Sequence, residues 1–447
     1  MAHSSHRLSR RIRLVAAIAA GAMALSLAAC GTSGPTGSGG GSAAGAATMW
    51  ALSGQPKEGL RQDTVDAFNK ANPDEKLEVT FFQNDAYKTK IRTAIGAGQA
   101  PTLIYGWGGG TLKAYADAGQ VEDLTSFFAD NPDVKDRLFP GSFGAATIDD
   151  KIYAMPIQDV QPIVLFYNKK VFADAGVETP KTWEDLMSLV ATFNEKGIAP
   201  ISLAGQSRWT SMMWLEYLFD RIGGPEVFND IFLGKPDAWS NPAALEALQK
   251  AQDLVAADGF IKGFNSITAD SNADQALLYT GKAAMMLHGG WTYGSMKADG
   301  QNFVQDGDLG FVSFPTIEGG VGDAENVVGN PANYLSISSS ASDEQKKIAE
   351  DYLKTGLFTD AEIDGLIENG AVPVVNGVDD KLAATDDADY LTFVYQLAGN
   401  APSFQQSWDQ ALSPTAAEAL LNNIDQLFSR SITPEEFAAN MNKTIGK

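Results

Sequence analysis

The sequence has one cysteine, Cys30, and three histidines among its 447 residues. A single cysteine cannot form a disulfide within the chain, so the fold must rely on its hydrophobic core. His3 and His6 lie in an N-terminal segment that we interpret below as a signal, which leaves His288. A zinc site of several histidines is therefore excluded, and a Ser-His-Asp or Cys-His site would have to use His288. We expect no metal, no cofactor and no catalytic residues.

Basic residues are scarce as well. The chain has 33 Lys and Arg against 55 Asp and Glu. Residues 1–29 contain four arginines and no acid, so the rest carries 29 basic and 55 acidic residues, a formal charge of −26. Nucleic-acid binding depends on Lys and Arg that replace counterions, so we expect no such partner. The acidity fits solubility at a cell surface.

The longest uncharged apolar run, residues 14–29, is shorter than the roughly 20 residues of a membrane span. Four arginines precede it, which is typical of a secretory signal peptide. The run ends in Leu27-Ala28-Ala29-Cys30, which resembles the bacterial lipobox, where the cysteine is acylated and the signal is cut just before it. An ordinary signal with a chance cysteine is the alternative. We expect residues 1–29 to be a lipoprotein signal peptide.

The segment after Cys30 is almost wholly Gly, Ser, Ala and Thr. Such a composition cannot bury enough apolar surface to fold, so residues 30–47 are predicted to be a lipid-anchored flexible linker. Its reach is roughly 20 to 25 Å. The folded part, expected from Thr48, would be held outside the cell at the outer face of the cytoplasmic membrane. About 400 residues are too many for one core and indicate two domains.

The first third of the folded part alternates between short apolar runs and amphipathic segments. We expect strands at 49–52, 77–82 and 102–105, each followed by a helix. This alternation predicts an α/β fold with a parallel sheet, whose ligands bind at the carboxyl ends of the strands. The loops at Ser53, Asn84 and Trp107 occupy those ends. Later segments are mostly helical, with capping patterns at Thr182 and Ser342.

Eight tryptophans are the main clue to function. We expect Trp183 and Trp239, at helix starts, to be packing residues. The other six are candidate ligand contacts, and five of them lie beside glycine or small polar residues, which leaves room for a flat ligand. Core packing is the alternative for each ring. The six are Trp50, Trp107, Trp209, Trp291 and Trp408, which have such neighbours, and Trp214, which does not.

Amides and carboxylates near these rings would complete the site. Sugar rings have an apolar C–H face and a rim of hydroxyls, so they suit tryptophan faces flanked by polar side chains. We expect a neutral sugar, with His288 as a packing residue behind the Trp291 loop. The candidate polar partners are Asn84, Asp85, Gln158, Asp159, Asn330, Asn333, Gln405 and Asp409.

Several motifs along residues 48–447 resemble a known family. They are NDAYKTK at 84–90, APTLIY at 100–105 where the family more often has Pro-Asp, YAMP at 153–156, LFYNK at 165–169, TPKTWEDL at 179–186, and GKAAMM at 281–286 before Gly290-Trp291. With the lipobox, they resemble extracellular solute-binding proteins of the carbohydrate-uptake ABC class, the family that includes maltose-binding protein. The loop Gly329–Tyr334 resembles actinobacterial members that take xylobiose or related β-linked oligosaccharides.

The resemblance implies a type II periplasmic-binding-protein fold with two discontinuous α/β lobes. The first would contain residues 48–158 and about 312–363, and the second about 159–311 and 364–447. The chain would cross between the lobes near 158–162, 309–314 and 363–372. Trp291 and Trp408 would be stacking platforms, the loops at Asn84 and Trp107 would contribute from the first lobe, and the lobes would close on the sugar. The implied partner is a membrane ABC permease, and we expect a monomer.

Two alternatives stay open. A glycoside hydrolase would share an aromatic cleft, and with 55 acids some carboxylate pair could have the required spacing. Against it, Asp85, Asp159 and Asp409 sit beside amides and suit hydroxyl binding better. A binding protein for a polyamine or a peptide would keep the fold and change the ligand, but several carboxylates or a wider cleft would be needed.

Overall fold

The computed structural model describes residues 45–446. The expected signal peptide, the Cys30 anchor and nearly all of the linker lie outside the described residues. The ordered chain begins slightly earlier than expected, because Ala46 and Ala47 are already buried. The Ala47 N–H donates to the Lys76 carbonyl, and the Gln345 side chain donates to the Ala46 carbonyl. The expected linker therefore ends near residue 45.

The first sheet has the order β2-β1-β3-β12-β6. Its first three strands are parallel and alternate with α1, α2 and α3, which confirms the expected α/β pattern, whereas β12 is antiparallel to its neighbours. The strands are β1 (Ala47–Leu52), β2 (Leu77–Phe82), β3 (Leu103–Gly106), β6 (Met155–Ile157) and β12 (Asn333–Ile337). The helices of this first lobe are α1 (Lys57–Ala71), α2 (Asn84–Gly96), α3 (Gly109–Asp117), α4 (Thr125–Asp130), α5 (Pro132–Asp136), the 3-10 helix η1 (Pro140–Ala146), α13 (Asp343–Thr355) and α14 (Asp360–Glu368).

The second sheet has the order β13-β11-β7-β9-β8, with β10 also paired to β7. Both faces of β7 are covered, because Ile163 and Leu165 pack in one hydrophobic cluster and Val164 and Phe166 in another. The strands are β7 (Gln161–Asn168), β8 (Ala199–Ser202), β9 (Ala283–Gly289), β10 (Leu309–Val312), β11 (Val327–Asn330) and β13 (Phe404–Gln406). A small hairpin outside both sheets joins β4 (Thr147–Ile148) to β5 (Lys151–Ile152).

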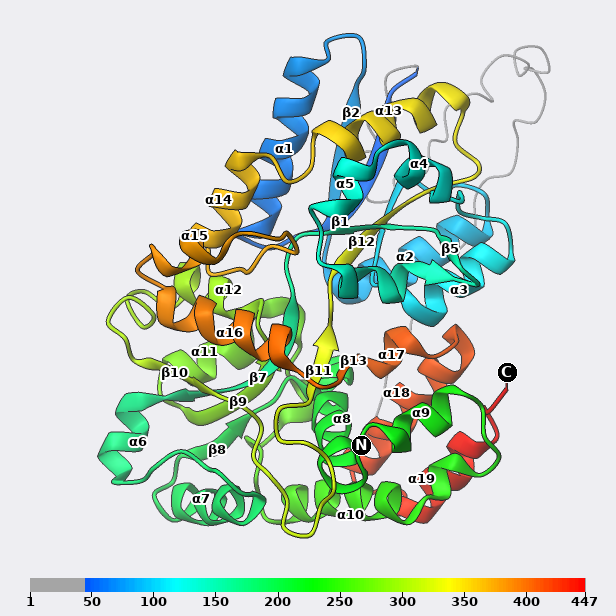
Figure 1. Cartoon of the computed structure of the whole chain (residues 1–447). Coiled ribbons are helices and arrows are strands. Elements are labelled where there is room, and N and C mark those ends of the chain that lie inside the picture. Colours follow the sequence, from blue (N-terminus) through cyan, green and yellow to red (C-terminus); the bar gives the residue numbers. More distant parts are fainter. Residues whose placement is uncertain (1–44, 447) are drawn as a thin grey trace, which may run out of the picture. The chain divides into compact units, whose positions relative to one another are not determined.

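Helices surround this second sheet and form the second lobe (Figure 1). They are α6 (Lys169–Ala175), α7 (Trp183–Glu195), α8 (Trp209–Gly223), α9 (Glu226–Phe232), α10 (Pro242–Ala256), α11 (Ala273–Tyr279), α12 (Thr292–Asp299), α16 (Ala388–Asn400), α17 (Trp408–Ala411), α18 (Pro414–Phe428) and α19 (Pro434–Asn442). The short α15 (Asp379–Ala383) contacts α14 and α16. The predicted caps are present, because Thr182 and Ser342 each form a capping box.

The chain passes between the two sheets at places that only partly match the expectation. The first passage, from β6 to β7, lies at residues 158–160, within the expected segment. The second was expected at 309–314, but β10 and β11 both belong to the second sheet, so the passage lies between Asn330 and Asn333. The third passage lies after Val375 and not at 363–372. Residues 363–368 belong to α14, which still packs on α1 of the first lobe.

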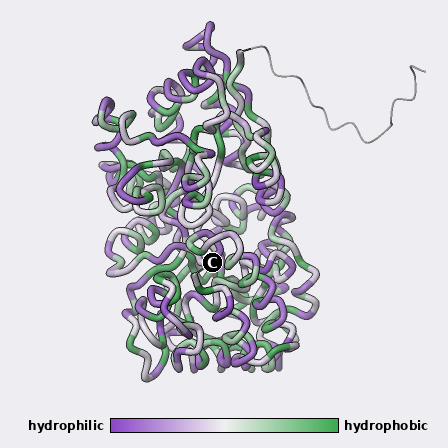
Figure 2. Tube along the Cα trace, turned by 90° about the vertical axis from the view of Figure 1, so that its right-hand side faces the viewer, coloured by the Kyte–Doolittle hydropathy of each residue, from purple (hydrophilic) through white to green (hydrophobic). Residues whose placement is uncertain are grey.

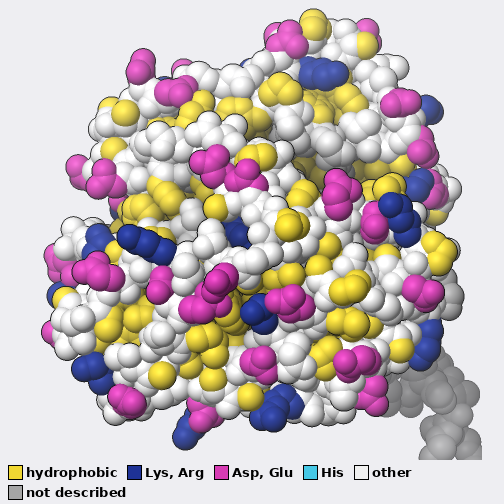
Figure 3. Space-filling model, turned by 60° about the horizontal axis from the view of Figure 1, so that its bottom comes forward, with side chains coloured by type: hydrophobic (Ala, Val, Ile, Leu, Met, Phe, Trp, Pro, Cys, Tyr) yellow, Lys and Arg dark blue, Asp and Glu magenta, His cyan; other side chains and the backbone are white. Residues whose placement is uncertain are grey.

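The distribution of side chains follows this architecture. Hydrophobic stretches lie mainly inside and hydrophilic ones along the outer segments (Figure 2). On the face in Figure 3, acidic side chains are spread widely, with lysines and arginines among them. Within residues 45–446 no helix has the length and apolarity to cross a bilayer.

Candidate functional site

A cavity of about 430 Å³ lies where the two lobes meet. The first lobe contributes the ends of β1 and β3 and the start of α2, and the second contributes the starts of α8 and α12 and residues around α17. The carboxyl ends of β1, β2 and β3 therefore reach the cavity, as the parallel sheet predicted. Eight predicted site residues line it: Asn84, Trp107, Gln158, Trp209, Trp291, Asn330, Asn333 and Asp409.

Trp209 and Trp291 form an aromatic wall on the second-lobe side. Their ring centroids are 6.1 Å apart with the planes at 46°. Trp209 is the first residue of α8, and it follows Arg208, whose φ of 62° and ψ of −45° are uncommon for a residue with a Cβ. Such backbone strain is concentrated at functional sites. Trp107 faces them from the first lobe, packed edge-on against Tyr105 at 5.4 Å.

Two lysines that the sequence analysis did not select also line the cavity, and each is paired with a predicted acid. Lys57 Nζ lies 2.6 Å from Asp159 Oδ1, and Lys88 Nζ lies 2.9 Å from Asp409 Oδ2. Lys88 also sits 4.9 Å from the centre of the Trp107 ring, within cation–π range. Lys57 and Lys88 thus neutralise Asp159 and Asp409. Two other acids line the cavity and accept backbone N–H groups, Glu58 from Gly54 at 2.8 Å and Asp270 from Asp85 at 3.2 Å. Among the described residues no group of three or more His, Cys, Asp or Glu side chains is placed to hold a metal.

Asp85 does not line the cavity but joins the two lobes beside it. Its carboxylate accepts hydrogen bonds from the Ser207 hydroxyl at 2.8 Å and from the Trp209 indole at 3.1 Å. In return, the Asp85 backbone N–H donates to Asp270 of the second lobe at 3.2 Å. Burial, and then the nearby Asp85 charge, raise the pKa of Asp270. Asp85, which was predicted to bind ligand hydroxyls, thus uses its carboxylate in a contact between the lobes.

Amides gather where the chain passes between the lobes. Gln161 Nε2 donates to Asn333 Oδ1 at 2.6 Å, and the Tyr105 hydroxyl donates to Gln158 Oε1 at 3.2 Å. Asn330 is only 6 % exposed, and its Oδ1 has no hydrogen-bond partner within the described chain. A buried acceptor without a donor is costly. Asn330 lines the cavity, so a ligand hydroxyl could supply that donor.

Asp159, like Asp85, does not line the cavity, and nor do four other predicted residues, to which the structure gives other roles. Trp408 and Trp214 are 0 % exposed. Trp408 stacks on Phe228 with centroids 4.7 Å apart and planes at 6°. The prediction of Trp408 as a stacking platform is therefore wrong, because no face of its ring is free. Gln405 accepts from the Trp408 indole at 2.9 Å, and Trp50 packs on Phe82 outside the cavity.

The glycines beside the tryptophans mostly serve packing, not ligand access. A Cβ on Gly109 would lie 2.5 Å from the Gln410 carbonyl, and one on Gly110 2.3 Å from the Leu412 carbonyl. Both glycines thus allow α3 of the first lobe to touch the α17 segment of the second. A Cβ on Gly289 would lie 1.9 Å from the Trp291 ring. The glycines beside Trp107 and Trp291 were expected to leave room for a ligand, but they allow close packing instead. Both tryptophans line the cavity all the same.

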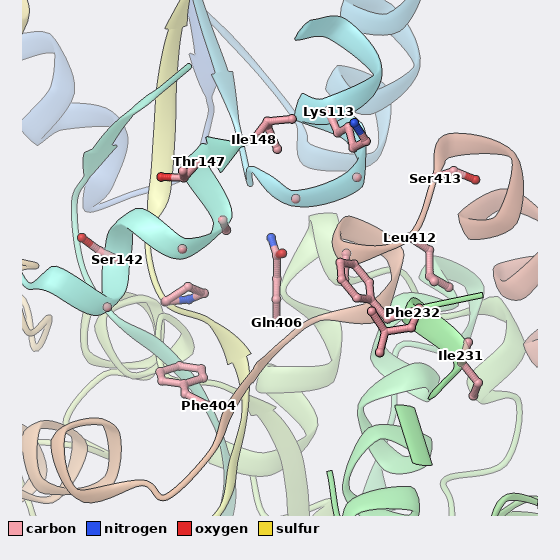
Figure 4. A pocket seen from close by; sticks show the side chains of 18 of the residues that line it. Lys113, Ser142, Thr147, Ile148, Ile231, Phe232, Phe404, Gln406, Leu412 and Ser413 are labelled. Carbon is pink, nitrogen blue, oxygen red and sulfur yellow. The ribbon is translucent and has the colours of Figure 1, made fainter. Parts of the chain in front are cut away.

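A larger cavity of about 1340 Å³ contains none of the predicted site residues. Val160 and Pro331 line it, whereas Gln158 and Asn330 line the smaller one, so the connecting segments separate the two cavities. Figure 4 shows Phe404, Phe232 and Leu412 around this larger cavity, among mostly apolar neighbours. Its lining lacks the paired tryptophans and buried amides of the smaller cavity, so we take the smaller one as the candidate functional site.

Residues 51–363 match the bacterial extracellular solute-binding protein family. This chain belongs to that family. Its fold is that of maltose-binding-protein-like receptors: a solved structure of maltose-bound MalE3 from T. maritima has a TM-score of 0.72 at 18% identity, covering 89% of this chain and 98% of that one. At that identity the likeness concerns the fold alone.

Three further proteins are similar to this chain. A solved structure from work on xylan utilization by Caldanaerobius polysaccharolyticus is 31% identical, with a TM-score of 0.79, covering 90% of this chain and 100% of that one. The diacetylchitobiose binding protein of Streptomyces coelicolor is 27% identical over 81% of each chain. The xylose/arabinose-binding protein of Haloferax volcanii is 29% identical over 48% of this chain and 45% of its own. This chain spans about half the length of the Haloferax protein and of two Pyrococcus relatives that it matches.

Proposed function

We propose that this protein is the substrate-binding lipoprotein of an ABC-type sugar importer and that it holds a neutral oligosaccharide in the cavity between its lobes. One observation carries the proposal: the Trp209–Trp291 wall and the unpartnered Asn330 oxygen line the same cavity. An aromatic wall suits the C–H face of a sugar, and a lone acceptor suits a hydroxyl.

The charges around the cavity support a neutral ligand. Asp159 and Asp409 are each paired with a lysine, so neither carboxylate is left to bind a cation. At Asp159 or Asp409 a polyamine would have to displace a lysine and would then face the released ammonium group. The other two acids of the lining, Glu58 and Asp270, already accept backbone N–H groups. A neutral sugar leaves both ion pairs intact. Binding of a peptide or a polyamine is therefore the result that would contradict a neutral sugar in the screen below.

We further propose a β-linked disaccharide, with xylobiose as the leading candidate. The relatives support this choice: one comes from work on xylan utilization and another is named for diacetylchitobiose. The cavity, about 430 Å³, falls within the usual range for sites of small ligands. We propose that the sugar is bound and handed to a membrane permease unchanged, since each acid of the cavity lining already has a partner: Asp409 pairs with Lys88, and Glu58 and Asp270 accept backbone N–H groups.

A thermal-shift screen of residues 45–447 against neutral mono- and disaccharides, spermidine and a tripeptide tests the proposal. A ligand at 100 times its dissociation constant adds about 2.7 kcal/mol to the free energy of unfolding, enough to raise the melting temperature. We expect a shift with xylobiose or another β-linked disaccharide and no hydrolysis product after overnight incubation. A shift with spermidine or the peptide alone, or product formation, would reject the sugar-binding proposal.

Replacing Trp291 or Trp209 by alanine should weaken disaccharide binding by about 1 to 3 kcal/mol, by analogy with stacking of bases on aromatic rings. Isothermal titration calorimetry would measure the loss. The matched control is Trp50→Ala, because Trp50 is also a partly exposed tryptophan but does not line the cavity. Equal losses in all three variants would contradict the assignment of the wall.

We also propose that Cys30 carries the lipid anchor. Cys30→Ser should release the protein into the medium, since the thiol is the acylation site that the lipobox resemblance implies. Ligand affinity should not change, because the cavity lies wholly within residues 51–410. Cell fractionation of the full-length protein and its variant would show the difference. Retention of the Cys30→Ser protein at the membrane would mean that the anchor lies elsewhere.

A further inference from the structure

A buried aspartate and a buried histidine face each other behind the Trp209–Trp291 wall. Asp274, at the start of α11, is 1 % exposed, and His288, on β9, is 2 % exposed. Asp274 Oδ2 lies 3.3 Å from His288 Nε2. Within the described residues, neither carboxylate oxygen of Asp274 has a hydrogen bond of good geometry. The imidazole is thus the polar group that faces this buried carboxylate.

The imidazole of His288 touches both tryptophans of the wall. Its ring is edge-on to Trp209 at 5.4 Å and 86°, and edge-on to Trp291 at 5.4 Å and 81°. The Gly289 N–H donates to His288 Nδ1 at 2.9 Å, which leaves Nε2 to carry the proton toward Asp274. The backbone therefore holds one ring nitrogen, and the other faces the Asp274 carboxylate at 3.3 Å without hydrogen-bond geometry, so that only electrostatic attraction acts between them.

We propose that Asp274 and His288 are positioning residues that set the angle between Trp209 and Trp291 and thereby tune sugar affinity. A carboxylate buried without other donors stays close to the one N–H available, because separating them would leave an unsolvated charge. That attraction fixes the rotation of the imidazole, and the imidazole edge limits how each indole can turn.

The same pair supports the contact between the lobes. The Trp209 indole N–H reaches Asp85 of the first lobe at 3.1 Å, which requires a fixed ring plane. If the Trp209 ring turned, the aromatic wall would change and the hydrogen bond to Asp85 would be lost at the same time. The effect of the pair on affinity rests on the proposed function, whereas its effect on the tryptophan angle does not.

Asp274→Leu removes the acceptor that faces Nε2, and Asp274→Asn keeps an acceptor there. We expect Asp274→Leu to weaken xylobiose binding about tenfold, within the range that one stacked ring contributes. Asp274→Asn should keep most of the affinity. The matched control is Tyr217→Phe, which loses a buried hydrogen bond of 2.6 Å to the Ile163 carbonyl in the same lobe without touching either tryptophan. Its affinity should equal that of the wild type.

A spectrum without ligand separates positioning from general destabilisation. The tryptophan bands at the long-wavelength end of the near-ultraviolet circular dichroism spectrum report the coupling of neighbouring indoles. Asp274→Leu should change these bands, and Tyr217→Phe, which alters only a tyrosine, should leave them unchanged. In a Trp209→Phe background the change caused by Asp274→Leu should largely disappear. If no sugar binds the wild type, the proposed function fails while this spectral test still stands.

A second variant keeps the proposal testable if Asp274→Leu does not fold. In Asp274→Leu/His288→Phe both polar partners are replaced by apolar groups, which buried pairs often tolerate. We expect this double variant to fold and to bind xylobiose less tightly than the wild type. Wild-type affinity and an unchanged near-ultraviolet spectrum in Asp274→Leu, or wild-type affinity in the double variant, would overturn the positioning role.

Discussion

Replacing Trp408 by alanine should lower the free energy of unfolding by about 3 to 5 kcal/mol, the usual cost of truncating a large buried aromatic side chain. The ring is stacked on Phe228 and edge-on to Phe219 at 4.7 Å and to Trp239 at 5.8 Å. Truncation would leave a cavity among three aromatic rings and would also remove the indole N–H that Gln405 accepts.

Urea unfolding of residues 45–447, followed by circular dichroism, measures this loss. The conservative control is Trp408→Phe, which keeps one ring in the stack and should lose less. At a temperature where Trp408→Ala is still folded, sugar affinity should stay close to that of the wild type, because the ring does not line the cavity. Normal stability together with lost affinity would restore Trp408 as a binding platform.

Trp408 shows why part of the site could not be predicted from the sequence. Its neighbours Gln405, Gln406 and Ser407 indicated a strand end or a turn, and Gln405 and Gln406 do end strand β13. The aromatic partners of the ring come from α8, from α9 and from the 3-10 helix Ala238–Ser240, all far earlier in the chain. Local composition describes the backbone around a tryptophan but not the side chains that cover its ring, so Trp408 and Trp291 looked alike.

The alternating part of the fold was predictable because its signals are local. The strand at 77–82 has the predicted bounds, and α1 and α2 follow the expected helical spacing. The second passage between the lobes was not predictable in the same way. Leu309–Val312 reads as a buried strand, but only its pairing with β7 assigns it to the second sheet. A run of apolar residues does not specify its partner.

The charged and buried groups of the site were the hardest to find. Lys57 and Lys88 lie on helices of the first lobe as ordinary surface residues would, and their partners Asp159 and Asp409 are distant in sequence. His288 was expected only to pack behind Trp291. It does contact that ring, and its pairing with Asp274 could not be read from spacing. The sequence therefore predicted which residues lie at the ends and faces of the sheet. It did not predict which side chains, distant in sequence, pair with one another.

Glu216 is a further buried group without a sequence signal, and it should make the stability of the protein depend on pH. It lies on α8 at 0 % exposure, where Oε1 accepts the Trp408 backbone N–H at 2.8 Å. Burial, and to a lesser degree the Asp409 charge, raise the pKa of Glu216 from 4.5 to about 8. The folded protein thus holds this proton more tightly than the unfolded chain does.

The sign of the pH effect follows from that difference. Between the pKa of Glu216 in the unfolded chain and its pKa in the folded protein, rising pH removes the proton from the unfolded chain only. Losing the proton lowers the free energy of the unfolded chain, while the folded protein keeps its proton and gains nothing. Wild-type stability should therefore fall from about pH 5 to about pH 8, by up to about 3 kcal/mol from this group. Glu216→Gln removes the proton and should flatten the curve over the same window.

Urea unfolding at several pH values would compare the wild type with Glu216→Gln and with Glu195→Gln, an exposed glutamate of the same lobe. The difference in stability between Glu216→Gln and the wild type should grow in favour of the variant as pH rises, while Glu195→Gln should run parallel to the wild type. Parallel curves for all three proteins would mean that Glu216 is ionised in the folded state and that a partner of its carboxylate has been missed.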